Sequence, residues 1–203
     1  MNTDTIRDDL AFLKGLAESG GRTQWTGGAV FVAGGMLYGL QCVVQWAQAI
    51  GLITMGSRPT IVFTAGITVA FLIALCIILV RNRKLTAQGI SNKAFNAVFA
   101  ATGLTNVVLI IIFASVAIPR QSIVIWELYP AALFALQGSA WYVAFLLRRK
   151  LWLVVVAGGW FASAIALGLL VGTTNYVLAC GIALIIFMTV PGFYMMRLAR
   201  QVA

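Results

Sequence analysis

Six long apolar stretches constrain the fold of this chain more than any other feature. They cover residues 26–50, 60–80, 94–118, 123–147, 151–172 and 176–196. A membrane-spanning helix needs about 20 predominantly apolar residues, and each stretch is long enough. Lipid offers no hydrogen bonds to an open backbone, so a spanning segment must satisfy its own polar groups, as a helix does. The sequence therefore predicts an all-α polytopic membrane protein with six transmembrane helices.

The composition supports this fold class and removes much chemistry. Of the 203 residues, 62% are hydrophobic and 9% are charged, whereas soluble domains carry about 25% charged residues. The chain has no histidine, its three cysteines are scattered without a CxxC pair, and every aspartate precedes the first span. Intramembrane hydrolases need serine with histidine, paired aspartates, or histidine with glutamate. We therefore expect no enzyme, no catalytic residues, no metal and no cofactor.

The basic residues are distributed very unevenly between the two sides of the predicted bundle. One side receives twelve of the fourteen: Arg7, Lys14, Arg22, Arg81, Arg83, Lys84, Lys93, Arg148, Arg149, Lys150, Arg197 and Arg200. Only Arg58 and Arg120 fall on the other side. Basic residues are retained in the cytoplasm, so both termini are predicted to be cytoplasmic. We expect a multi-pass protein of a bacterial inner membrane, and the absence of an Asn-x-Ser/Thr acceptor agrees with a bacterial origin.

The same basic residues lie beside apolar spans, which indicates membrane topology rather than nucleic-acid binding. The basic loop of residues 81–93 is expected to lie against anionic lipid headgroups, at about 1 kcal/mol per basic residue. We expect the lipid bilayer to be the partner of these loops.

Residues 1–22 are predicted to form a cytoplasmic amphipathic helix, and residues 23–203 the transmembrane bundle. Within residues 3–19, Ile6, Leu10, Leu13 and Ala17 recur at spacings of four, three and four. Gly20-Gly21 is expected to end this helix. Four of the five acids lie here. The helix either lies flat on the bilayer or against the protein's own basic loops, or presents its acids to a cytoplasmic protein partner.

Small residues and one proline indicate how the helices pack. Two ridges have a spacing of four: Gly35 with Gly39, and Ala164 with Gly168 and Gly172. Such ridges allow close helix packing, within the bundle or in a homo-oligomer. Pro191 is expected to kink the last span, because it removes a backbone donor and clashes with the preceding turn.

Three spans open with similar short Ala/Gly segments, at residues 30–35, 98–103 and 154–159. Three related hairpins would produce this pattern. The alternative is that small residues are simply common in packed membrane helices.

Polar side chains inside the predicted spans form the candidate site. Intramembrane polar groups are costly and normally face the bundle interior. By helical spacing, the polar residues of the first, third and fourth spans each gather on one side of their helix. If these faces meet, Gln45, Gln48 and Glu127 line an outward-facing vestibule, and Gln41, Asn106 and Gln137 lie below it near the bilayer centre. The candidate residues are Tyr38, Gln41, Gln45, Gln48, Thr102, Asn106, Arg120, Glu127 and Gln137. Arg120 is the expected counter-charge of Glu127. The alternative is that these groups only bond helices together, at roughly 0.6 kcal/mol each.

Two functions of different classes remain open. The first is a non-catalytic accessory, scaffold or regulatory component of a membrane complex. The second is a small permease or channel that passes a neutral or weakly charged solute through the Gln/Asn-lined interior. A continuous polar passage would favour transport, and a dry, closed bundle would favour the accessory role.

Overall fold

The structure is a computed structural model that describes the backbone of residues 3–81 and 90–202 and the side chains of residues 24–81 and 93–201. Every regular element in these ranges is a helix. The order is α1 (Thr3–Ala49), α2 (Ser57–Arg81), α3 (Ile90–Arg120), α4 (Ile123–Arg148), α5 (Leu151–Leu170), α6 (Tyr176–Leu184), the π-helical turn η1 (Ile185–Thr189) and α7 (Val190–Val202). Six helical segments are long and apolar enough to cross a membrane, which confirms the predicted six-span, all-α architecture.

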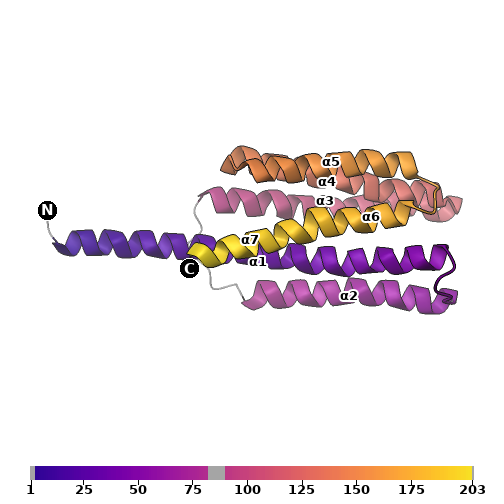
Figure 1. Ribbon diagram of the computed structural model, residues 1–203, viewed down its shortest axis with the longest axis horizontal. Helices are drawn as coiled ribbons and strands as arrows, with labels where there is room; N and C mark the ends of the chain where they lie inside the picture. The colour runs from indigo at the N-terminus through magenta and orange to yellow at the C-terminus, as the bar shows by residue number, and fades with distance from the viewer. Residues whose placement is uncertain (1–2, 82–89, 203) are drawn as a thin grey trace.

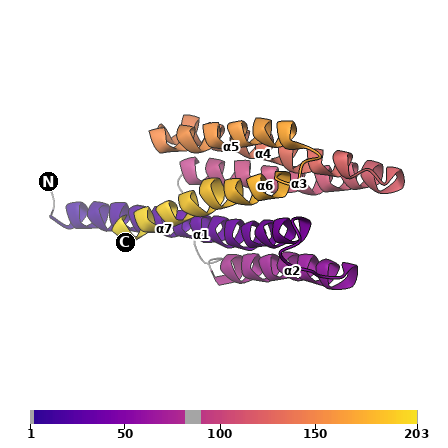
Figure 2. The same cartoon turned by 45° about the vertical axis from the view of Figure 1, so that its right-hand side comes forward.

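The helices pack side by side along one direction (Figure 1). Helix α1 packs against α2 on one side and against α6, η1 and α7 on another, while α4 packs between α3 and α5. Helix α5 connects the two groups through α6. The second view in Figure 2 shows the same two groups. Three equivalent hairpins in a closed ring would require α2 to pack on α3 as α4 packs on α5, and the described residues form no such α2–α3 interface.

Helix α1 is a single rod of 47 residues rather than two helices. The predicted end at Gly20-Gly21 is wrong, because the backbone continues through both glycines as a helix. Glycine inside a helix costs only about 1 kcal/mol relative to alanine, and it keeps its hydrogen-bonding groups. The part of α1 before the bundle projects beyond the other helices in both views (Figures 1 and 2). The predicted amphipathic pattern falls on residues 1–22, whose side chains lie outside the described ones.

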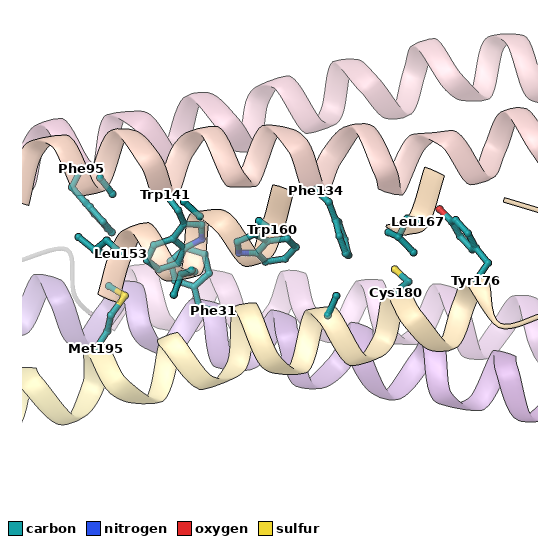
Figure 3. Packing of buried hydrophobic residues seen from close by; sticks show 14 residues of the cluster. Phe31, Phe95, Phe134, Trp141, Leu153, Trp160, Leu167, Tyr176, Cys180 and Met195 are labelled. Carbon is teal, nitrogen blue, oxygen red and sulfur yellow. The ribbon is translucent and has the colours of Figure 1, made fainter. Parts of the chain in front are cut away.

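Aromatic side chains fill the space between the two groups of helices (Figure 3). Trp141 of α4 is fully buried, and its ring centroid lies 5.1 Å from that of Phe31 in α1. Phe134 of α4 meets Trp160 of α5 edge-on, with 4.7 Å between the ring centroids. Edge-to-face rings at such distances are favourable beyond the area they bury. The interior at these levels is therefore packed with rings.

Glycines allow α1 and the last span to approach closely. A Cβ built on Gly28 would lie 2.6 Å from the carbonyl oxygen of Gly192, and one built on Gly35 would lie 2.8 Å from the backbone nitrogen of Thr189. Only residues without a Cβ fit at such a crossing. The Gly35/Gly39 ridge thus packs inside the bundle, whereas Gly168 faces open space.

The last span changes its helical form immediately before Pro191. Residues Ile185–Thr189 form a π-helical turn, in which the Val190 N–H donates to the carbonyl oxygen of Ile185. Proline cannot donate an N–H, and its ring clashes with the carbonyl four residues earlier. A wider turn relieves this conflict without ending the helix. Where the sequence predicts a kink at Pro191, the structure has this π-helical turn immediately before the proline.

Candidate functional site

A polar seam joins α1 to α2. The side-chain amide nitrogen of Gln45 donates to the hydroxyl of Thr64 at 3.3 Å, and that of Gln48 donates to the hydroxyl of Thr60 at 3.3 Å. One level further along, the Tyr38 ring lies 5.3 Å from the ring of Phe71, measured between centroids. Because the two helices are antiparallel, higher residue numbers in α1 pair with lower residue numbers in α2. Three of the four predicted polar residues of α1 therefore face α2.

A second polar contact joins α3 to α4. The Tyr129 hydroxyl donates to Oδ1 of Asn106 at 2.5 Å. Thr102, one turn earlier on α3, is buried and donates to the carbonyl oxygen of Val98 in its own helix at 2.9 Å. Hydroxyl groups in membrane helices commonly bond backward in this way. The Asn106 side chain therefore forms a hydrogen bond between two helices, whereas the Thr102 side chain forms one within its own helix.

Glu127 connects α4 to the turn between α5 and α6. Its Oε2 accepts a hydrogen bond from the backbone N–H of Gly172 at 2.6 Å, and its backbone oxygen accepts one from the hydroxyl of the buried Tyr176. Gly172 has a φ of +79°, in the left-handed region that favours glycine. The carboxylate thus receives an N–H left unpaired where α5 ends, and it holds this turn against α4.

The structure does not bring the predicted vestibule residues together. Gln45 and Gln48 face α2, whereas Glu127 faces the α5–α6 turn. Arg120 is exposed at the end of α3. In the described part of the chain, the hydrogen bonds of Glu127 go to Gly172 and Tyr176 rather than to Arg120. The helical spacing of the polar residues predicted that they share a face of their helix, but it did not predict which neighbouring helix that face contacts.

Two amide oxygens remain without a partner inside the described bundle. The Oε1 atoms of Gln41 on α1 and Gln137 on α4 are buried and accept no hydrogen bond there. Four indole N–H groups and one hydroxyl are in the same state: those of Trp46, Trp141, Trp152, Trp160 and Thr189. An unpaired buried polar group costs free energy, about 1–3 kcal/mol in proteins. The described interior thus contains both hydrogen-bond donors and hydrogen-bond acceptors that lack a partner.

Sequence reasoning missed the contact between Cys42 on α1 and Cys180 on α6. The two side chains lie close together between α1 and α6, at a level where a Cβ built on Gly181, the residue after Cys180, would lie 2.8 Å from the Cβ of Cys42. The two residues are far apart in sequence, and no short motif links them. The only available signal was that each cysteine neighbours a small or polar residue in its span.

The described surface has a shallow depression of about 260 Å³ at the turn between α3 and α4. Its lining is mostly apolar: Ala117, Ile118, Gln121, Ser122, Ile123 and Trp126. It lies at the end of the bundle opposite the projecting part of α1, as the positions of α3 and α4 in Figure 1 show. The predicted site residues Gln41, Asn106 and Gln137 are not part of it.

Comparisons of this chain with profiles of known protein families, with curated proteins and with solved structures find no match.

Proposed function

We propose that this protein is a non-catalytic accessory component that organises a membrane complex. The continuous helix α1 is the observation that carries the proposal. Its 47 residues extend about 70 Å at about 1.5 Å per residue, more than twice the roughly 30 Å thickness of the hydrocarbon core. A rod that crosses the membrane and continues beyond it is suited to linking a membrane complex to a protein in the aqueous phase.

The use of the polar side chains also supports an assembly role. Gln45, Gln48 and Asn106 form bonds between helices, and Glu127 holds a turn. Such contacts stabilise a bundle without supplying a reaction or a passage. Aromatic rings fill the space between α1, α4 and α5, where a solute would have to pass. The four polar side chains named above therefore have hydrogen-bond partners within the bundle.

We infer that the end of the bundle from which α1 projects faces the cytoplasm of a bacterial cell. The end of α2, the end of α4 and the end of α7 lie at that end of the bundle (Figure 1), and each has a basic residue in its last turn. Basic residues are retained on the cytoplasmic side. Anionic headgroups are then the lipid partners of these helix ends.

A second candidate function is a small permease for a neutral or weakly charged solute. The unpaired oxygens of Gln41 and Gln137 favour it, because buried acceptors without partners are available to a passing donor. The test is solute entry into proteoliposomes containing the full chain or the Gln41→Leu/Gln137→Leu double variant. Gln201→Leu, at an exposed helical position in α7, is the matched control. Uptake that only the double variant abolishes would establish transport.

Isolation in native lipid tests the accessory role. Membranes are dissolved into polymer-bounded lipid discs, and the proteins that remain with the full chain are identified. The comparison is a variant that lacks residues 2–20. A larger protein that stays with the full chain and is lost from the shortened chain supports the proposal. The same set of proteins with both chains would contradict it.

A further inference from the structure

Four of the unpaired polar atoms in the described interior lie near the middle of the bundle. They belong to the indole N–H groups of Trp141 and Trp160, the side-chain oxygen of Gln137 and the hydroxyl of Thr189. Trp141, Trp160 and Thr189 are almost completely enclosed, with exposed fractions of 0%, 1% and 4%. Buried polar atoms in proteins nearly always have a partner, which is either another protein group or an ordered water. These four atoms therefore require a partner that the side chains around them do not supply.

Contacts between α1, α4 and η1 place three of these atoms at one level of the bundle. The ring of Phe31 on α1 lies 5.1 Å from that of Trp141 on α4, measured between centroids. Because α1 and α4 are antiparallel, Gly35 and Gln137 each lie one turn further along in the same direction. The hydroxyl of Thr189 borders Gly35, since a Cβ built on that glycine would clash with it. The turn of α4 that carries Gln137 thus lies at the level of η1.

Helix α5 contributes the fourth atom at the same level. The ring of Trp160 lies 4.7 Å from that of Phe134, which is three residues from Gln137 on α4, and 6.4 Å from that of Phe187 in η1. Figure 3 shows Trp141 and Trp160 next to each other along the bundle, with their indole nitrogens on the sides that face each other. One helical turn is about 5.4 Å. The four polar atoms therefore converge on the space between α4, α5 and η1.

The hydrogen-bonding capacity of these atoms is complementary to that of one water molecule. An indole N–H can only donate and an amide oxygen can only accept, whereas a hydroxyl can do either. A water molecule accepts from Trp141 and Trp160 and donates to Gln137 and Thr189, so all four groups are satisfied at once. An anion could accept from the indoles but could not donate to the amide oxygen. We propose that Trp141, Trp160, Gln137 and Thr189 bind a single water molecule at the centre of the bundle.

The bound water connects three elements that have no direct side-chain hydrogen bond at this level among the described residues. It joins the π-helical turn to α4 and α5 through Thr189, beside the position where the backbone of α1 approaches most closely at Gly35. Buried waters of this kind typically form about three hydrogen bonds and are costly to remove. The site is enclosed by aromatic rings, so it holds one molecule without forming a passage. It is therefore independent of the proposed accessory role.

Nuclear magnetic resonance of the indole N–H protons tests this site. The full chain, with isotope-labelled tryptophan, is measured in lipid nanodiscs, and single Trp→Phe variants assign the signals. The protons of Trp141 and Trp160 should both show a rotating-frame Overhauser peak to water, whose sign separates it from proton exchange. Thr189→Val and Gln137→Leu should each remove both peaks. Thr102→Val is the matched control and should leave them, because that buried hydroxyl is bonded within its own helix.

The absence of a water peak at either indole in the unmodified protein would overturn the proposal. Two peaks that persist in Gln137→Leu, or in a folded Thr189→Val variant, would also overturn it. Loss of both peaks in the site variants, with both retained in Thr102→Val, would support it.

Thermal unfolding provides a second test of the shared water. The side chains of Gln137 and Thr189 are not bonded to each other, so a bridging molecule is needed to couple them. Because either Gln137→Leu or Thr189→Val releases the water, the double variant should melt no lower than the less stable single variant. Gln137→Leu combined with Thr102→Val should instead show additive losses in melting temperature. Additive losses in both pairs would overturn the proposal.

Discussion

The carboxylate of Glu127 on α4 accepts a hydrogen bond from the backbone N–H of Gly172, 2.6 Å away at the end of α5. This contact explains the position of the one acid that follows residue 18. Helix ends leave backbone groups without partners, and these groups are costly where water is scarce. Glu127 therefore has a structural task at the α5–α6 turn.

Removal of this carboxylate should destabilise the bundle. Glu127→Ala is expected to lower the free energy of unfolding by about 1–3 kcal/mol, the range for loss of a charged partner from a polar group. Glu127→Gln keeps a carbonyl acceptor and should cost less. Thermal unfolding of the purified protein in detergent measures both changes. Equal losses for the two variants would show that the Gly172 contact does not account for the effect.

The crossing of α1 and α7 should reject even one added methyl group. Gly28→Ala places a Cβ 2.6 Å from the backbone oxygen of Gly192, so the helices must separate. Overpacking of this kind costs about 1–3 kcal/mol. Gly168→Ala is the matched control, because that position faces open space. The melting temperature should fall for the first variant only, and a similar fall for both would contradict this packing.

The polar seam between α1 and α2 should contribute a small but measurable coupling. Gln45→Leu and Thr64→Val each remove one side of the 3.3 Å hydrogen bond. A double-mutant cycle should give a coupling energy near the roughly 0.6 kcal/mol average for hydrogen bonds between membrane helices. Unfolding in bicelles, measured by steric trapping, can resolve such a value. Strictly additive effects would show that the two side chains do not interact.

The thiols of Cys42 and Cys180 should form a disulfide when an oxidant enters the membrane. Copper phenanthroline accepts the two electrons, and the two thiols lose their protons as the sulfur–sulfur bond forms. The product links α1 to α6 within one chain and should migrate faster in non-reducing electrophoresis. Cys180→Ala should abolish this band, whereas Cys76→Ala should retain it, because Cys76 is exposed on α2. A band that depends on Cys76 would contradict the contact.

The sequence was sufficient to predict the spans because each span satisfies its own backbone. Length and hydropathy alone therefore located six helices, and the structure confirms them. The prediction that the first helix ends at Gly20-Gly21 was wrong. Glycine permits a helix to end but does not require it, and the helix of α1 continues through both residues.

The grouping of the polar residues could not be predicted, since it depends on which helices are neighbours. Helical spacing correctly placed Gln45 and Gln48 on one face, but their partners Thr60 and Thr64 come from α2 rather than from the helix of Glu127. Helix α1 packs on α2, its neighbour in the sequence, but it also packs closely on α6 and α7. A contact between the first and last spans carries no local pattern in the sequence.

The pairing of α1 with α6 and α7 has a consequence for biosynthesis. The first span to leave the ribosome packs most extensively with the last one, so it must wait in the membrane with α2 beside it until synthesis is nearly complete. During that interval the glycines of α1 are exposed to lipid and to any other helix in the vicinity. Assembly of this bundle is thus completed only when residues 176–201 arrive, and a chain released before them would keep its first span available to foreign partners.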